Sequence, residues 1–505
     1  MQSLGGRRKG DCCFLLFNGR NPKTGAQRER GTRMKVDGRL LGRLMVVCLV
    51  VAVPIFILSI DSFAAQTTKK MSDIFGKANS NQILLDIEAA LARAEAKLGI
   101  IPQSAADEIT RKADVKYLPE EELAKEFKKV GHPMVAIINV WARYMDGNAG
   151  EFIHYGATTQ DIYDTSYVIQ LRAAARIMLN DMREIEASLI DMAKKYRDTP
   201  MMGRTLGQHA LPITFGMKVG VWIAENRRNM ERLKDCLKRL NSGILKGAVG
   251  SYAGLGEKGF EIEELLMKEL GLAPPDPADW HGVKDNFAEF GNVMALIGMT
   301  YGKIGQEIFL LQSTDIGEVE ERLPSTAVGS STMPHKRNPG KSKDLVVLSR
   351  EIRRHAEVIM DWMVSIHERD QISSAGQLEE ICLKTDKLLK AARPLLKDLN
   401  VFPDAMMENI NKTRGLIMSE KLMFVLGEKI GKHTAHEAVR VLSMEAFKKK
   451  ISLKDAVLAK PELAKHLKKE ELDEIFDPMK YIGLAPQEVD RVIAATMKLR
   501  ETDNF

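Results

Sequence analysis

The chain has 505 residues, of which 45% are apolar and 28% charged, and its formal net charge is +6. This composition is typical of a folded protein and excludes a disordered, collagen-like or low-complexity chain. Five cysteines in a chain of this length are too few for a disulfide-stapled scaffold. They include no Cys-x-x-Cys pair, which argues against a zinc–thiolate site.

The positive charge belongs to an N-terminal extension, residues 1–70, which holds 13 Lys and Arg against 4 Asp and Glu. The rest of the chain carries a net −3 and shows no charge pattern of a nucleic-acid-binding protein. Within the extension, residues 44–60 are uncharged and apolar, follow several basic residues and precede small ones, which is typical of a secretory signal or a membrane anchor. We therefore expect export or membrane contact through 44–60, or a cytoplasmic protein if its true start is Met71.

From Gln82 onward the apolar residues recur with helical spacing. The first stretch, 82–97, places Ile83, Leu84, Ile87, Leu91 and Ala94 on one face. Longer helices are predicted over 165–196, 214–240, 286–316, 341–367 and 376–396. Helices of this length need neighbours along their whole face, so the pattern predicts an all-α fold with a long central helix bundle. We expect three helical domains, with boundaries at 71–165, 166–425 and 426–505.

Two polar segments flank the first long predicted helix. The segment 154–161 runs into its start, where Thr158, Thr159 and Gln160 could bind an anion at the helix N-terminus or simply cap the helix. The segment 202–212 joins two helices and is either a polar turn or a clamp for a carboxylate, built from Arg204, Thr205, Gln208 and His209.

Two further polar segments precede later helices. Residues 280–285 contain Lys284 and either cap the following helix or contribute to a site. Residues 329–340 form a loop shaped by Gly and Pro, of a kind that closes over substrates. This loop offers a proton acceptor, a cation and an amide donor through Ser330, Ser331, Lys336 and Asn338.

The loop sequence, GSSTMPHKRNP from Gly329 to Pro339, resembles the GSSxMPxKxNP signature of the fumarase/aspartase superfamily. The order of all four segments is similar to that family from about Met71 to the C-terminus. Within the family, the chain resembles the adenylosuccinate lyase and 3-carboxy-cis,cis-muconate cycloisomerase branch. This resemblance implies three α-helical domains assembled as a homotetramer, active sites that each take segments from three subunits, a small polycarboxylate substrate, and no metal or organic cofactor.

The resemblance also implies roles for individual residues. Ser330 matches the serine that removes a proton next to a carboxylate, and His154 matches a histidine near the leaving group. Lys336 and Asn338 match residues that hold one substrate carboxylate, and the Thr158–Thr159 pair matches residues that hold another. We therefore expect catalytic groups among Ser330, Ser331, His154 and His209, and substrate contacts from Thr158, Thr159, Gln160, Arg204, Thr205, Gln208, Lys284, Lys336 and Asn338.

One departure from the family pattern bears on the reaction. Family members that eliminate amines read Gly-Arg-Thr-His in the second segment, and Leu206 stands here at the His position. An amine leaves poorly unless it is protonated, and general acid catalysis is worth about 10² to 10⁴ in rate. A carboxylate, as in lactone opening or closing, needs no such proton, and the stretch Trp280-His281 with Asp285 and Glu289 also resembles the cycloisomerases.

The expected function is therefore a cycloisomerase-like member that abstracts a proton alpha to a carboxylate and eliminates or re-adds the beta substituent. An adenylosuccinate lyase that releases fumarate remains open, with His209 or His154 as the acid. A catalytically dead structural tetramer is the alternative from another class, and the intact Ser330, Lys336 and Asn338 argue against it.

Overall fold

The computed structural model describes residues 70–277, 280–324, 326, 329–370 and 373–504. The N-terminal extension, with the predicted export or anchor segment at 44–60, lies outside this part of the chain. None of the helices in the described ranges is both long and apolar enough to cross a membrane. All of the described residues belong to one compact unit, 60–505.

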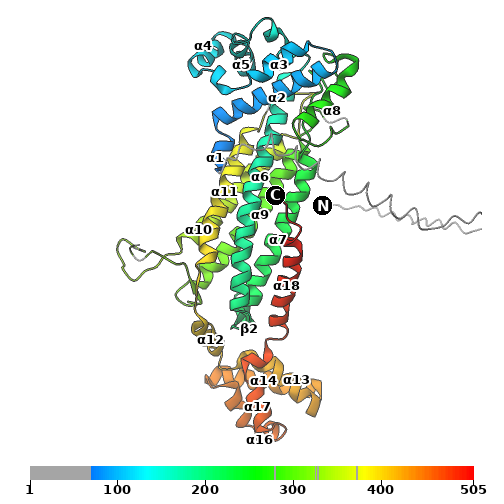
Figure 1. The fold of residues 1–505 in the computed structure, drawn as a ribbon. Helices are drawn as coiled ribbons and strands as arrows, with labels where there is room; N and C mark the ends of the chain where they lie inside the picture. Colours follow the sequence, from blue (N-terminus) through cyan, green and yellow to red (C-terminus); the bar gives the residue numbers. More distant parts are fainter. Residues whose placement is uncertain (1–69, 278–279, 325, 327–328, 371–372, 505) are drawn as a thin grey trace, which may run out of the picture. The chain divides into compact units, whose positions relative to one another are not determined.

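Helices dominate the described residues, so the predicted all-α class is confirmed. The central bundle consists of α6 (Thr159–Lys195), α7 (Phe215–Leu240), α9 (Asp285–Leu311), α10 (Gly340–Asp361) and α11 (Gly376–Lys397). These helices run alongside one another in Figure 1. Each turns an apolar stripe inward, and the shared core includes Leu171, Phe290, Tyr301, Ile352 and Leu388.

The predicted long helices correspond to these five, with their ends shifted by at most six residues. The largest shift at a start is that of α6, which begins at Thr159 rather than 165. Its first turn forms because Thr158 is extended and donates its backbone N–H to the Asp161 carboxylate at 2.9 Å, as an N-cap does. A cap of this kind ends a loop and starts a helix before the apolar periodicity becomes visible.

Smaller helices lie beyond both ends of the bundle. One set shares a second apolar core: α2 (Lys77–Lys97), α3 (Gln103–Arg111), α5 (Pro133–Ala142) and α8 (Gly259–Glu269). Helix α4 (Glu120–Val130) and the short 3₁₀ helices at Val115–Tyr117, Ala149–Phe152 and Gly256–Lys258 accompany this set. Helix α1 (Met71–Ile74) instead contributes Met71 and Ile74 to the bundle core. Another set has its own core: α13 (Ser419–Ile430), α14 (Lys432–Lys449), α15 (Leu453–Leu458), α16 (Pro461–Ala464) and α17 (Lys469–Ile475). Figure 1 places α2 and α8 at one end of the bundle and β2 and α13 to α17 at the other.

The chain returns to the bundle at its C-terminus. The last helix, α18 (Ala485–Arg500), packs against α7, and Val489 joins the bundle core. Beyond α18, the buried carboxylate of Asp503 accepts hydrogen bonds from Arg183, Arg227 and Lys234. The three predicted domain boundaries stay a prediction.

A β-hairpin occupies the segment that the sequence suggested was a polar link between two helices. Strands β1 (Pro200–Thr205) and β2 (Gln208–Thr214) pair antiparallel between α6 and α7. Leu206 and Gly207 form the two-residue turn with φ of 51° and 75°, the left-handed values that a tight hairpin of this length requires. The second small sheet pairs β3 (Val319–Glu320) with β4 (Asn400–Val401), and α12 (Pro403–Asn411) and the 3₁₀ helices Leu416–Met418 and Pro478–Tyr481 complete the described elements.

Candidate active site

The segment that leads into α6 is organised by the buried carboxylate of Asp161. Its Oδ2 accepts the backbone N–H groups of Thr158 at 2.9 Å and Gly247 at 3.1 Å. Its Oδ1 accepts the N–H of Lys246 at 2.9 Å and lies 2.8 Å from Nε2 of His281. One carboxylate therefore fixes the start of α6, the loop after α7 and the segment before α9 in a single arrangement.

His154 lies at the start of this segment and is bound by Glu88 of α2. Its ring Nδ1 is 2.6 Å from Glu88 Oε1, and its backbone N–H donates to Glu88 Oε2 at 3.1 Å. Burial on its own lowers the pKa of His154, but the hydrogen bond and charge of Glu88, together with the charge of Asp161, outweigh burial and raise it. His154 therefore keeps a proton to a higher pH than a free histidine does.

Thr158 and Thr159 stand at the N-terminus of α6, where backbone N–H groups and the helix dipole favour an anion. Gln160 donates from Nε2 to Oδ1 of Asp164, one turn further along α6, at 2.7 Å. Lys284 is buried and donates to the other oxygen of Asp164 at 2.5 Å, with its ammonium over the ring of Trp362. The structure thus places Lys284 in a buried ion pair with Asp164.

The hairpin carries the second predicted cluster. Arg204 donates from Nη1 and Nη2 to the two carboxylate oxygens of buried Glu318, at 3.0 and 2.6 Å, so it clamps a carboxylate of its own chain. Thr205 and Gln208 are exposed near the turn, and the Leu206 side chain is fully exposed. Burial, followed by the positive charge of Arg204, lowers the pKa of His209 below that of a free histidine.

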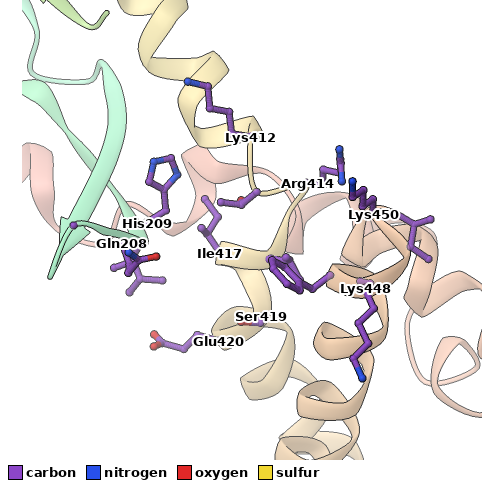
Figure 2. A pocket seen from close by; sticks show the side chains of 17 residues that line it. Gln208, His209, Lys412, Arg414, Ile417, Ser419, Glu420, Lys448 and Lys450 are labelled. Atoms are coloured by element: carbon purple, nitrogen blue, oxygen red, sulfur yellow. The ribbon is translucent and has the colours of Figure 1, made fainter. Parts of the chain in front are cut away.

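A pocket of about 1010 Å³ lies between the hairpin and the helices α12 to α14 (Figure 2). His209 and Gln208 form part of its wall on the hairpin side. The other walls are rich in positive charge and come from Lys412, Arg414, Lys448 and Lys450, with Glu420 as the acidic residue among the lining side chains. This pocket therefore offers a positively charged surface beside the hairpin.

The loop before α10 contains the signature residues. Ser330 Oγ accepts backbone N–H groups from Met333 at 3.1 Å and Thr332 at 3.4 Å. Asn338 donates from Nδ2 to the carbonyl of Gly329 at 2.8 Å and so closes the loop on itself. Lys336 is exposed, and Ser331 contacts only Thr332 Oγ1, at 3.5 Å, within the described residues.

Within one chain, the segment at the start of α6 and the hairpin lie far apart. Thr158 stands at the start of α6, and the hairpin begins five residues after its end. A helix of 37 residues is about 55 Å long, so α6 holds the two clusters far apart. Figure 1 shows the same separation, with β2 at the opposite end of the bundle from α2 and α8. His154, Thr158 and Thr159 form one group, and Arg204, Thr205, Gln208 and His209 form another.

Sequence reasoning missed several residues that shape these groups. Glu88 sits one turn after Leu84 within a buried stripe, and a charged residue there signals a buried partner. Asp161 follows Thr158 at capping-box spacing, which is a local signal for its role. No local signal marks Glu318, because its partner Arg204 lies 114 residues away in the sequence.

Comparison with known proteins agrees with the fold. The Lyase family matches residues 63–353, and the family described as the adenylosuccinate lyase C-terminus matches residues 415–492. An adenylosuccinate lyase of Methanocaldococcus jannaschii is 41% identical over 431 residues, which cover 84% of this chain and 93% of the relative. An N-acetyl-S-(2-succino)cysteine lyase of Dickeya dadantii is 40% identical over 429 residues, covering 84% of this chain and 94% of the relative.

Among solved structures, a 3-carboxy-cis,cis-muconate lactonizing enzyme from Pseudomonas putida is similar, with a TM-score of 0.79 and 32% identity. The match covers 87% of this chain and all of that enzyme. A family match over more than half of the sequence, with relatives near 40% identity over almost their full length, establishes ancestry and general activity. The chain belongs to the fumarase/aspartase superfamily and is a lyase or isomerase of its adenylosuccinate lyase and carboxymuconate cycloisomerase branch.

Proposed function

We propose that this enzyme abstracts a proton alpha to a carboxylate of a succinate-type polycarboxylate and expels, or re-adds, a beta substituent that departs as an anion. The preferred reaction is cycloisomerisation of the 3-carboxymuconate type, in which the group that leaves or adds is a carboxylate. The observation that carries this proposal is Leu206, a fully exposed side chain with no proton to give, at the position of the family's acid.

Ser330 is the proposed base. A serine hydroxyl is a poor base at its free pKa, but N–H groups that donate to its oxygen stabilise the alkoxide. Two backbone N–H groups, of Thr332 and Met333, donate to Ser330 Oγ. Proton removal leaves a dianionic aci-carboxylate, which needs fixed cations and hydrogen-bond donors. Lys336, Asn338 and the Thr158–Thr159 pair supply groups of that kind.

The chemistry of the leaving group selects among substrates. An amine is far too basic to leave as an anion, so its elimination needs an acid. A carboxylate leaves without help, and a thiol of pKa about 8.5 leaves readily as a thiolate. Leu206 is therefore compatible with carbon–oxygen and carbon–sulfur cleavage, and it disfavours adenylosuccinate as the substrate.

Carbon–sulfur cleavage is the second candidate, because relatives named N-acetyl-S-(2-succino)cysteine lyase are 40% and 39% identical to this chain. The substrate named there is a succinate with a thioether at the beta carbon. It fits the same base, the same carboxylate contacts and the absence of an acid at Leu206. In the first candidate a carboxylate oxygen is bonded to the beta carbon, and in the second a thioether sulfur is, so one experiment with both substrates separates them.

A homotetramer with shared active sites is part of the proposal. The length of α6 separates the two groups of candidate residues within one chain, so a complete site needs segments from other copies. Large apolar side chains are also exposed on bundle helices, among them Leu296, Met299, Phe309, Leu310, Val347 and Val358. Such residues on α9 and α10 provide apolar area for helix packing between copies.

The test offers the purified full-length chain three substrates separately and follows ultraviolet absorbance. These are 3-carboxy-cis,cis-muconate, N-acetyl-S-(2-succino)cysteine and adenylosuccinate. Turnover of the muconate supports the preferred reaction, and fumarate release from the thioether supports the second candidate. Efficient turnover of adenylosuccinate alone would contradict the proposal, because it would require an acid that replaces Leu206.

A further inference from the structure

Glu88 directs both oxygens of its carboxylate at one residue, His154. The side chain of Glu88 is 1% exposed, and it meets the ring Nδ1 at 2.6 Å and the backbone N–H at 3.1 Å. Burying an acid in the apolar core beneath α2 is costly unless its partner is fixed and polar. This acid therefore has a specific partner, and the partner is a candidate catalytic residue.

The backbone of His154 is held in an uncommon conformation. Its φ is 63°, in the left-handed region that few residues other than glycine adopt. Two residues on, Gly156 also has a positive φ, and a Cβ there would lie 2.7 Å from the carbonyl oxygen of Gly254. Such strained positions persist where the surroundings over-determine them, and they gather at functional sites. The Glu88 bond to the His154 N–H is one of the contacts that fix this conformation.

The same pair determines the state of the ring. A carboxylate at Nδ1 fixes the proton on that nitrogen, and Nε2 makes no hydrogen bond within the described residues. The charged groups near the ring are acidic: Glu88 from α2, and Asp161 from the first turn of α6. The Asp161 carboxylate also contacts the ring of His281. Glu95 lies two turns along α2 from Glu88, and after burial the charge of Glu88 raises the pKa of Glu95.

We propose that Glu88 is a positioning residue that holds His154 as an imidazolium with Nε2–H free to hydrogen-bond the anionic leaving group. This inference rests on the proposed function, since it assigns the donor that stabilises the departing carboxylate or thiolate without transferring a proton. His209 is less suited to this role, because burial and the charge of Arg204 lower its pKa and so disfavour its protonated form. With Leu206 in place of a histidine, the hairpin turn offers no imidazole. We therefore assign the role of charged hydrogen-bond donor to His154.

The first test compares pH–rate profiles of the wild type and Glu88→Gln with the best of the three substrates. Gln keeps the size and the hydrogen-bonding ability of Glu but removes the charge. We expect the alkaline limb of kcat to move to lower pH by about one unit or more, as the loss of a neighbouring carboxylate predicts. Glu88→Asp retains the charge and should restore part of the shift. A uniform fall in rate with an unmoved limb would indicate a structural role only and would overturn the proposal.

Glu95→Gln is the matched control. Glu95 is a buried glutamate of the same helix with no hydrogen-bond partner in the described residues, so it should leave the alkaline limb in place. An equal shift in both variants would overturn the specific role of Glu88, because it would mean that removing either buried carboxyl group of α2 changes the pKa of the essential group equally.

A second readout does not depend on turnover. Diethyl pyrocarbonate modifies neutral imidazole, and mass spectrometry of the His154 peptide reports the rate of modification at each pH. We expect half-maximal reactivity at a higher pH in the wild type than in Glu88→Gln, by about one unit or more. If no substrate is turned over, the proposed function fails while this measurement still decides the state of His154. Equal midpoints in the two proteins would overturn the inference.

Discussion

Arg204 and Glu318 form a two-pronged ion pair that ties the hairpin to the segment after α9. The Nη1–Oε2 and Nη2–Oε1 distances are 3.0 and 2.6 Å, and Glu318 is fully buried. Asn409 of α12 also donates to Glu318, at 2.8 Å. The hairpin that carries Thr205, Gln208 and His209 is therefore positioned by a carboxylate 114 residues away from Arg204 in the sequence.

Glu318→Ala should destabilise the protein strongly, because it leaves the Arg204 guanidinium without its buried partner. Breaking a buried pair of this kind costs about 3 kcal/mol or more. Thermal unfolding checks this prediction, with Asp235→Asn as the control for an exposed ion pair of α7. The control should unfold like the wild type. An unchanged midpoint for Glu318→Ala would show that the pair does not hold the hairpin.

Ser330→Ala should reduce kcat by roughly 10³-fold or more, with substrate binding largely kept, because it removes the proposed base. Ser331→Ala should have a much smaller effect, since no backbone N–H in the described residues donates to the Ser331 hydroxyl. Steady-state kinetics measure the loss of turnover, and calorimetric titration of the inactive variant with substrate measures whether binding is kept. Normal turnover by Ser330→Ala would remove this serine from the mechanism.

The sequence predicted the features that depend on local spacing. Helical periodicity located the five bundle helices, and Gly and Pro residues located the loop at 329–340. The family signature in that loop and the residues 154–161 identified the family, which the comparisons confirm. Boundaries were less accurate, because a cap such as Thr158 with Asp161 acts before the apolar pattern begins.

Features that depend on distant pairing could not be predicted. The ammonium of Lys284 is bonded to Asp164, 120 residues away, while its expected contact with substrate stays a prediction. Arg204 was expected to clamp a carboxylate, and the one it binds belongs to Glu318. Such pairs form only after folding brings distant segments together, so no local sequence pattern predicts them.

Leu206→His should confer or increase elimination of an amine. Histidine tolerates the left-handed conformation at this turn better than leucine, so the hairpin should keep its shape. The new imidazole stands where the family's acid stands, and general acid catalysis is worth about 10² or more. Fumarate release from adenylosuccinate measures the gain. Leu206→Asn, which also fits the turn but is not an acid, is the control, and an equal gain there would refute the argument.

Glu95→Gln should stabilise the protein in a pH-dependent way. Burial, and then the charge of Glu88, raises the pKa of Glu95 to about 8 from a model-compound value of 4.5. Because the folded pKa is raised, the unfolded chain releases this proton first, and stability falls as pH rises from about 4.5 to 8. The glutamine of the variant does not titrate, so its contribution to the free energy of unfolding should not change over this pH range.

The expected gain for Glu95→Gln is about 3 kcal/mol at pH 7 and close to zero near pH 4. Unfolding free energies of the two proteins, measured across this range, check the prediction. A difference that is constant with pH would contradict it, because it would mean that Glu95 does not titrate between the folded and unfolded states in this window.

Mixed assemblies test whether active sites are shared between copies. Ser330→Ala and His154→Gln should each be inactive alone, because each lacks one group of the site. If the two residues reach a site from different copies, co-expressed variants form some sites with both groups intact. Random assembly at equal amounts gives such sites in about one case in four, so activity should return to about a quarter of the wild-type value. Pairing Ser330→Ala with the double variant Ser330→Ala/His154→Gln should restore nothing. Inactive mixtures of the two single variants would mean that one chain supplies both residues, and would contradict a site shared between copies.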